Sequence, residues 1–454
     1  VAGLQLAVLS SRSSADMQRL IASVTGTNRF ILDYLTEEVL ARQSPEVRTF
    51  LLQTSLLDRL CAPLCEAILG RDGESPAGSS PPTLPHDGTP AQNLLEYLDR
   101  ANLFVIPLDT ERQWYRYHHL FAELLQSCLR REQAGRVNTL HSRASRWYAD
   151  HGFVAEAIRH ALAGEDWAQA AALISDATNP LLRLGEVVTL LGWFSALPEA
   201  LVQSRAQLCL QHAWPLLLSG QVDAAERRLA RARELAPLED PPPRGNVSVF
   251  MGWVMGAESY IARARGDLSR AAELAHRALA ALPENDVDVR SAVGIILGMA
   301  HWHNGRMSEA EEVLQAAWDA AIRAGSTYAQ SSAQVYLGQV RAVRGRLREA
   351  AAMFTKVTAE DPHSTSATLA YLDLACLQYE WNNLDAAAES QQSATTLMER
   401  SDNSEFRLAA ELMLATLRSA RGDPQGALAK MREADVLAHA QGLPAQVCAR
   451  VADA

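Results

Sequence analysis

The sequence predicts an all-α protein, in which a small helical domain with one short β-hairpin precedes a long superhelix of paired helices. Three observations predict the superhelix: a recurring Gly or Asn about every forty residues, small residues at fixed places after it, and prolines that follow at a third fixed place. The chain has 454 residues, and 48% of them are hydrophobic, which suits two or three domains. Its net charge of -11 disfavours direct binding to nucleic acid.

Each repeat begins at an anchor residue that can turn the chain. Glycine and asparagine adopt positive φ more readily than other residues, so each anchor is expected to end one helix and lead into the next. The anchors are Gly220, Gly266, Gly305, Gly345, Asn382 and Gly422.

Small side chains recur five and twelve residues after the anchors. Both positions lie on one face of a helix, where small side chains let a neighbouring helix approach closely. The first set is Ala225, Ala271, Ala310, Ala350, Ala387 and Ala427, and the second is Ala232, Ala278, Ala317, Val357, Ala394 and Ala434.

Prolines mark the ends of several repeats. Pro237, Pro283 and Pro362 each follow their anchor by seventeen residues, where the second helix of a pair should stop. A single helix pair cannot bury its apolar face, so neighbouring pairs must stack into a solenoid with a long inner groove.

The repeats resemble a known family. Residues 331–362 match the spacing of the tetratricopeptide consensus through Leu337, Gly338, Gly345, Ala350, Phe354 and Pro362. The resemblance implies a right-handed superhelix. Such solenoids mostly bind proteins or peptides and sometimes small molecules, so the fold alone does not identify the ligand.

The first third of the chain predicts a different module. Ser44 is a plausible N-cap, with Pro45 at the first helical position, which places a domain boundary between them. Residues 71–90 are rich in Gly, Pro and Ser, so a mobile loop is expected there. The segments that follow predict a helix, two short strands and another helix, at residues 91–101, 103–107, 114–118 and 120–129.

Helices followed by a small hairpin indicate a winged-helix arrangement. We therefore expect a winged-helix-like domain over residues 45–134 and the superhelical domain over residues 135–454. Six cysteines scattered over a large chain are typical of reduced thiols in the cytoplasm. No apolar run of about 18 residues predicts a membrane span.

A second resemblance covers nearly the whole chain. The blocks FILDYLTEEVL, VRTFLLQTSLLDRLCAPLCEAILG, WYRYHHLFAELL and LHSRASRWYADHGFVAEAIRHALAGEDWAQAA resemble, in order, the middle region of the MalT-like, ATP-dependent LuxR-family activators of the STAND class. The resemblance implies a nucleotide-binding switch, a winged helix, a superhelical sensor and a DNA-reading helix-turn-helix in the full-length protein. Residues 1–44 would then be the helical end of the ATPase module.

The nucleotide-binding parts are not in this sequence. Its only lysines are Lys356 and Lys430, and neither belongs to a Gly-Lys-Ser/Thr phosphate loop. Nothing after Gly442 resembles a DNA-recognition helix pair. We therefore expect no cofactor in this chain, and the resemblance implies ATP or ADP, and self-association, only in the full-length active protein.

His118 is the candidate nucleotide sensor. The run Tyr117-His118-His119-Leu120 stands where related STAND winged helices carry a Met-His-Asp-like motif. The resemblance implies that His118 contacts the ADP phosphate, and an imidazole can donate a hydrogen bond to a phosphate oxygen. The alternative is a histidine that caps the corner between a strand and a helix.

Candidate ligand-binding residues come from consensus positions that face the groove. Aromatic rings beside hydrogen-bonding groups can hold a small polar molecule, such as a sugar, or a peptide. The alternative is that most of these side chains pack between helices. The candidates are Trp253, Tyr260, Arg263, Trp302, His303, Tyr336, Gln339, Asp373, Tyr379 and Glu380.

No pattern indicates a catalytic or metal centre. The sequence has neither His-Glu-x-x-His nor Gly-x-Ser-x-Gly, and His301 and His303 would point to nearly opposite sides of a helix. We therefore predict that the chain is not an enzyme and senses a small inducer for a transcription activator. The alternative is a free-standing scaffold that docks proteins or peptides.

Overall fold

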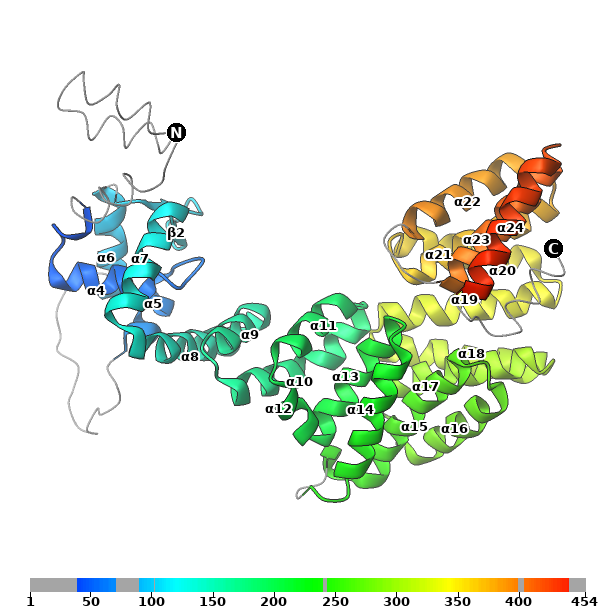
Figure 1. The fold of residues 1–454 in the computed structure, drawn as a ribbon, viewed down its shortest axis with the longest axis horizontal. Coiled ribbons are helices and arrows are strands. Elements are labelled where there is room, and N and C mark those ends of the chain that lie inside the picture. The colour runs from blue at the N-terminus through cyan, green and yellow to red at the C-terminus, as the bar shows by residue number, and fades with distance from the viewer. Residues whose placement is uncertain (1–38, 71–89, 102, 240–242, 399–403, 441–454) are drawn as a thin grey trace. The chain divides into compact units, whose positions relative to one another are not determined.

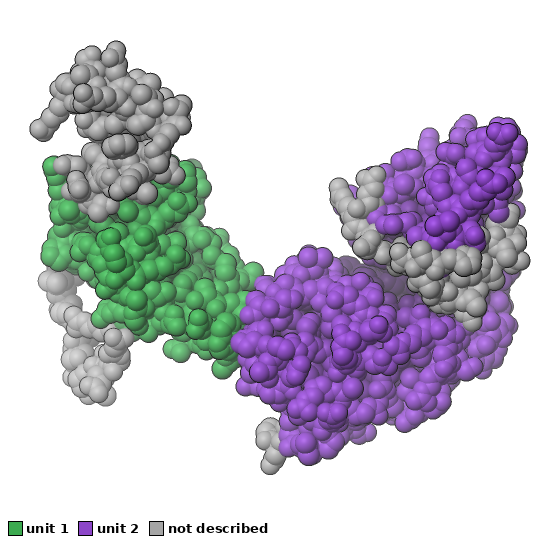
Figure 2. All heavy atoms as spheres, viewed as in Figure 1, with its two compact units in different colours: residues 1–173 green, residues 174–454 purple. Residues whose placement is uncertain are grey.

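The computed structural model describes residues 39–70, 90–101, 103–239, 243–398 and 404–440 (Figure 1). Most of the predicted segment 1–44 and nearly all of the predicted loop 71–90 lie outside the described residues, and Pro90 already belongs to a helix. The chain divides into two compact units, residues 1–173 and 174–454 (Figure 2).

The described part of the first unit is helical except for one hairpin. The side chain of Ser44 accepts a hydrogen bond from the backbone N–H of Val47 at 3.3 Å, which confirms the predicted N-cap. The elements are α4 (Pro45–Thr54), α5 (Ala62–Leu69), α6 (Pro90–Arg100), β1 (Val105–Pro107), β2 (Tyr115–Tyr117), α7 (His119–Glu132), α8 (Ala134–Asp150) and α9 (Val154–Ala163).

The two strands form the predicted antiparallel hairpin. Val105 lies opposite Tyr117, and both strands are shorter than the segments expected from the sequence. The carboxylate of Asp109 closes the turn, because it accepts hydrogen bonds from the backbone N–H groups of Gln113 at 2.9 Å and Trp114 at 2.8 Å.

The core of the first unit extends beyond the winged helix. Leu140 and Tyr148 of α8 share one hydrophobic core with Phe50 of α4. The guanidinium of Arg59 lies 4.8 Å from the ring centres of both Trp114 and Phe153. Helices α8 and α9 therefore pack with the winged helix, and the compact units divide after residue 173. The boundary between residues 134 and 135, where the sequence predicts that the superhelical domain begins, stays a prediction.

The second unit is a stack of helix pairs. Helix α10 (Trp167–Leu184) begins in the first unit and ends in the second. Then follow α11 (Val187–Ala196), α12 (Glu199–Ser204), α13 (Ala206–Leu218), α14 (Val222–Leu235), η2 (Pro243–Gly245), α15 (Val247–Ala264), α16 (Leu268–Ala281), α17 (Val287–His303), α18 (Met307–Ala324), α19 (Thr327–Val343), α20 (Leu347–Glu360), α21 (Thr365–Glu380), α22 (Leu384–Met398), α23 (Ser404–Ala420) and α24 (Pro424–Ala440).

The anchor residues turn the chain as predicted. Every anchor has positive φ, from 57° at Asn382 to 83° at Gly422, and each separates the first helix of a pair from the second. The second helices α14, α16 and α20 end two residues before their prolines. The small residues after the anchors are buried, and Ala225, Ala271 and Ala310 have no exposed surface. The stacked superhelix is therefore confirmed.

The two helices of each pair lie on different faces of the superhelix. We call α13, α15, α17, α19, α21 and α23 the first helices, and the helices that follow each of them the second helices. In tetratricopeptide superhelices the first helices line the inner groove. None of the described helices is long and apolar enough to cross a membrane.

Candidate functional site

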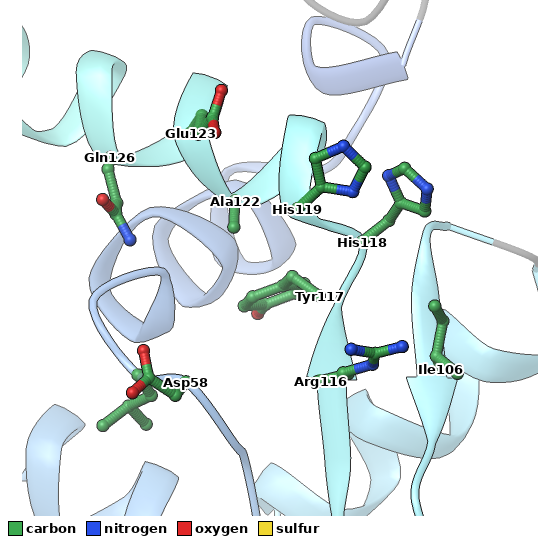
Figure 3. Close-up of a pocket in the computed structure, with 10 residues that line it drawn as sticks. Asp58, Ile106, Arg116, Tyr117, His118, His119, Ala122, Glu123 and Gln126 are labelled. Atoms are coloured by element: carbon green, nitrogen blue, oxygen red, sulfur yellow. The ribbon is translucent and has the colours of Figure 1, made fainter. Parts of the chain in front are cut away.

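A pocket of about 360 Å³ opens beside His118, where β2 passes into α7 (Figure 3). It lies within the first unit, and α7 and the residues after α4 supply most of its remaining wall. The lining residues are Leu57, Asp58, Ile106, Arg116, Tyr117, His118, His119, Ala122, Glu123 and Gln126.

His118 stands at the corner, but its imidazole does not cap the helix. The residue occupies the N-cap position of α7, and its backbone N–H donates to the carbonyl oxygen of Phe104 at 2.8 Å. The side chain makes no capping hydrogen bond, and its ring centre lies 4.4 Å from that of His119. His118 is therefore the residue at the corner between β2 and α7, as the alternative holds, while its imidazole also lines the pocket.

The charges around His118 favour its neutral form. Burial lowers the pKa of His118, and the neighbouring His119 and Arg116 lower it further. A neutral imidazole can still donate one hydrogen bond to an anion. Arg116 forms no ion pair with any described residue, whereas Asp58 on the opposite wall pairs with Arg159 at 2.6 Å. The lining of the pocket therefore combines the guanidinium of Arg116 with the carboxylates of Asp58 and Glu123.

Side-chain contacts fix the position of β2, the strand that ends just before His118. The hydroxyl of Tyr117 lies 2.7 Å from Oγ1 of Thr54 in α4, and both groups are buried. Tyr117 also packs edge-on against Phe121, with ring centres 6.0 Å apart. These contacts fix the backbone on both sides of His118.

The predicted groove residues all lie on first helices, namely α15, α17, α19 and α21. The structure brings some of them together. The guanidinium of Arg263 lies 4.8 Å from the ring centre of Tyr260, and the amide of Gln339 donates to a carboxylate oxygen of Asp373 at 2.7 Å.

Tyr328 was not predicted and joins the aromatic cluster. Burial raises the pKa of its hydroxyl, Tyr260 and Tyr336 raise it further, and Arg263 lowers it. Tyr260, Arg263 and Tyr336 therefore each lie within electrostatic reach of the Tyr328 hydroxyl. We call Tyr260, Arg263, Tyr328 and Tyr336 the tyrosine cluster.

The other predicted residues are either packed between helices or exposed. Trp253 is buried and its indole N–H donates to Asp286 at 2.6 Å. Trp302 and Tyr379 are half-buried against hydrophobic clusters between helices, and Tyr336 also packs in this way. His303 and Glu380 are exposed near the ends of α17 and α21.

A second pocket lies at the inner face of the superhelix. Its walls come from α10, α13, α15, α17 and α19, and they include the predicted Trp253 together with residues that the sequence did not suggest. The lining residues are Asn179, Leu182, Arg183, Trp214, Leu218, Trp253, Asp288, Val289, Ala292, Ser326, Tyr328 and Ala329.

One of the missed residues had a signal in the sequence. Trp214 stands six residues before its anchor Gly220, as the predicted Tyr260 does before Gly266. Extending the consensus by one repeat would have found it. Arg183 lies before the anchored repeats and had no such signal. Among the described residues, no group of three or more His, Cys, Asp or Glu side chains is placed to hold a metal ion.

Family models match two regions of the chain. The MalT winged helix domain matches residues 36–137, and the MalT-like TPR region matches residues 252–454. The first match contains the pocket beside His118, and the second contains every predicted groove residue.

Individual relatives agree with these models. The chain is similar to the serine/threonine-protein kinase PknK of Mycobacterium tuberculosis (strain ATCC 25618 / H37Rv), with 29% identity over 99% of this chain and 39% of the relative. It is also similar to the HTH-type transcriptional regulator MalT of Yersinia pestis (strain Pestoides F), with 27% identity over 97% of this chain and 47% of the relative. The chain thus spans less than half the length of these relatives.

A solved structure shares the fold. The STAND protein with a tetratricopeptide repeat sensor PH0952 from Pyrococcus horikoshii aligns with a TM-score of 0.56 and 12% identity, over 99% of this chain and 70% of that one. These matches and the architecture agree with the resemblance found in the sequence. The chain therefore carries a MalT-type winged-helix region and a MalT-like tetratricopeptide region.

Proposed function

We propose that this chain is the sensing and coupling region of a MalT-like transcription activator. A small inducer binds in the groove of the superhelix and shifts the equilibrium of a nucleotide-dependent switch elsewhere in the full-length protein. The observation that carries this proposal is the tyrosine cluster, in which aromatic rings and one guanidinium meet on first helices. Rings beside a few polar groups suit a small polar molecule.

The relay begins in the first unit. Helices α8 and α9 share a core with the winged helix, so a shift of α9 acts directly on the segment that holds His118. Arg59 strengthens this connection, because it pairs with Glu156 of α9 at 2.7 Å while stacking on Trp114. We propose that His118 contacts the phosphate of bound ADP in the full-length protein and reports the nucleotide state.

The activity of the relatives does not transfer as a whole. One relative is named a kinase, but the chain spans only 39% of its length. We propose no catalytic activity for this chain. Reading of DNA, binding of ATP and self-association would belong to the full-length activator.

A thermal-shift screen tests inducer binding. Neutral sugars, small metabolites and short peptides are added to the chain, and a ligand should raise its melting temperature. Arg263→Gln should abolish that shift, because Arg263 belongs to the tyrosine cluster. Arg277→Gln is the matched control, because this arginine lies on the second helix α16 and is exposed. Among the described residues its one ion pair is with Glu273, at 3.3 Å.

Two results would contradict this proposal. A shift that survives Arg263→Gln places the ligand outside the tyrosine cluster and contradicts the site. If no small molecule shifts the melting temperature but a protein or peptide binds in a pulldown, the chain is a docking scaffold and the inducer model is wrong.

A further inference from the structure

The corner between α10 and α11 forms part of the wall of the pocket at the inner face of the superhelix, through Leu182 and Arg183. We call this corner, residues 182–187, the strap. We propose that this pocket binds an uncharged small molecule that carries a hydrogen-bond acceptor, and that the strap must release for the molecule to enter. The proposal rests on the sensing function proposed above and adds a second site to it, which shares Tyr328 with the tyrosine cluster and has its own ligand class and gate.

The indole of Trp214 supplies the clearest sign of a ligand. Its side chain lines the pocket and is 6% exposed, and its Nε1–H has no hydrogen-bond partner among the described residues. Buried donors are rarely left unpaired in folded proteins. The neighbouring Trp253, whose ring centre lies 6.3 Å away, already donates to Asp286. Trp214 is therefore the donor that an acceptor atom of the ligand would satisfy.

The charges in the pocket explain why the ligand should be uncharged. The guanidinium of Arg183 donates two hydrogen bonds to the carboxylate of Asp288, at 2.7 and 2.8 Å, so the two charges neutralise each other. Leu182, Leu218 and Val289 make the adjacent wall apolar. A charged ligand would lose hydration here and would have to displace one partner of this pair.

The strap is held by a few contacts to a distant part of the chain. The carbonyl oxygen of Arg183 accepts hydrogen bonds from the hydroxyls of Ser326, at 3.4 Å, and Thr327, at 3.2 Å, at the start of α19. A Cβ built on Gly185 would lie 3.4 Å from the ring of Tyr328, so the corner rests on that side chain.

These contacts are suited to release. The side chain of Arg183 is 40% exposed and that of Asp288 is 20% exposed, so water and salt weaken their attraction. The hydroxyl bonds are long and involve neutral donors. When Arg183 leaves Asp288, the strap uncovers Trp214 without unfolding a helix pair.

Fluorescence quenching tests the gate without any inducer. Acrylamide is neutral and carries an acceptor oxygen, and the signal of Trp214 is the difference between the protein and its Trp214→Phe variant. Arg183→Gln should raise the quenching constant of Trp214 about 1.5- to 5-fold. Loss of a partly exposed ion pair should increase the population of the open strap by about this factor. Added sodium chloride should do the same in the unchanged protein and have little further effect in the variant.

The controls separate gating from unfolding. Arg265 lies outside the pocket and pairs with Glu226 at 2.7 Å. Arg265→Gln breaks that ion pair and should leave the quenching of Trp214 unchanged. Asp288→Asn is a second way to open the strap and should match Arg183→Gln, with circular dichroism unchanged in both. If neither pocket variant raises the quenching above that of Arg265→Gln, the strap is not a gate.

Charged quenchers test the ligand class. In the unchanged protein, acrylamide should quench Trp214 more strongly than iodide or caesium ions. Equal quenching by either ion would overturn the preference for an uncharged ligand. Because no inducer is used, the gate can fail while the thermal-shift screen succeeds, and the sensing function can fail while the gate is confirmed.

Discussion

Gly338 of α19 lies directly against the ring of Phe354 in α20. A Cβ atom built on Gly338 would be 2.6 Å from Cε1 of Phe354 and 3.1 Å from its Cζ. The absence of a side chain thus sets how closely the two helices of this pair approach, and Phe354 is almost fully buried in the contact.

Gly338→Ala should therefore destabilise the superhelix. The added methyl group would force the ring or the helix to move, which costs about 1–3 kcal/mol in a well-packed core. The free energy of unfolding in urea measures this loss. Gly192→Ala is the matched control, because Gly192 is an exposed helical glycine in α11 whose added Cβ would meet nothing within 4 Å. That change should be neutral or stabilising by up to about 1 kcal/mol.

The anchor Asn382 tests the turn between paired helices. Its φ of 57° is a left-handed conformation that costs most residues about 1–2 kcal/mol and glycine almost nothing. Asn382→Ala should lower the free energy of unfolding by about 1 kcal/mol, and Asn382→Gly should leave it equal or higher. If alanine were as stable as glycine at this position, the anchor would not set the turn.

His160 should make the stability of the first unit depend on pH. It is 1% exposed, and its Nδ1 lies 2.9 Å from that of His141. Burial, with Arg159 and His141, lowers the pKa of His160 to about 3. An unfolded histidine has a pKa of about 6.5, so between these values the unfolded chain binds the extra proton, and the free energy of unfolding falls as the pH falls below about 6.5.

The effect can be isolated by substitution. His160→Gln should reduce the slope of the free energy of unfolding against pH by about 1.4 kcal/mol per pH unit between about pH 5 and 6. Hydrogen exchange of the α8 and α9 amides measures this slope. His363→Gln changes an exposed histidine in the second unit and should leave the dependence as it was. An unchanged slope in His160→Gln would show that His160 is not held neutral by burial.

The proposed role of His118 predicts a change in nucleotide affinity. In the full-length protein, His118→Ala should weaken ADP binding by about 2- to 12-fold, the value of one ordinary hydrogen bond. Isothermal titration calorimetry measures it, and His363→Ala is the control. Identical ADP affinity in both variants would remove His118 from the phosphate site.

Local features were predictable from the sequence because one or two residues determine them. Ser44 with Pro45 defines the start of α4, and the anchor glycines take positive φ wherever they occur. The turn that Asp109 closes follows from neighbouring residues as well. These signals depend on backbone preferences that neighbouring elements do not change.

Contacts set by the superhelix were not predictable. Arg183 and Asp288 are far apart in the chain, and the curvature of the stack decides that they meet. The same holds for Gly185 and Tyr328. The groove residues were placed on the correct helices, but the consensus does not say which of them pack, as Trp253 does, and which form the tyrosine cluster.

We propose that ligand binding in the groove and the nucleotide state of the full-length protein are linked. Calorimetry on the full-length protein, with the inducer found by the thermal-shift screen, should give affinities that differ between the ADP-bound and ATP-bound forms by about 5- to 150-fold. Equal affinities in the two forms would contradict the claim.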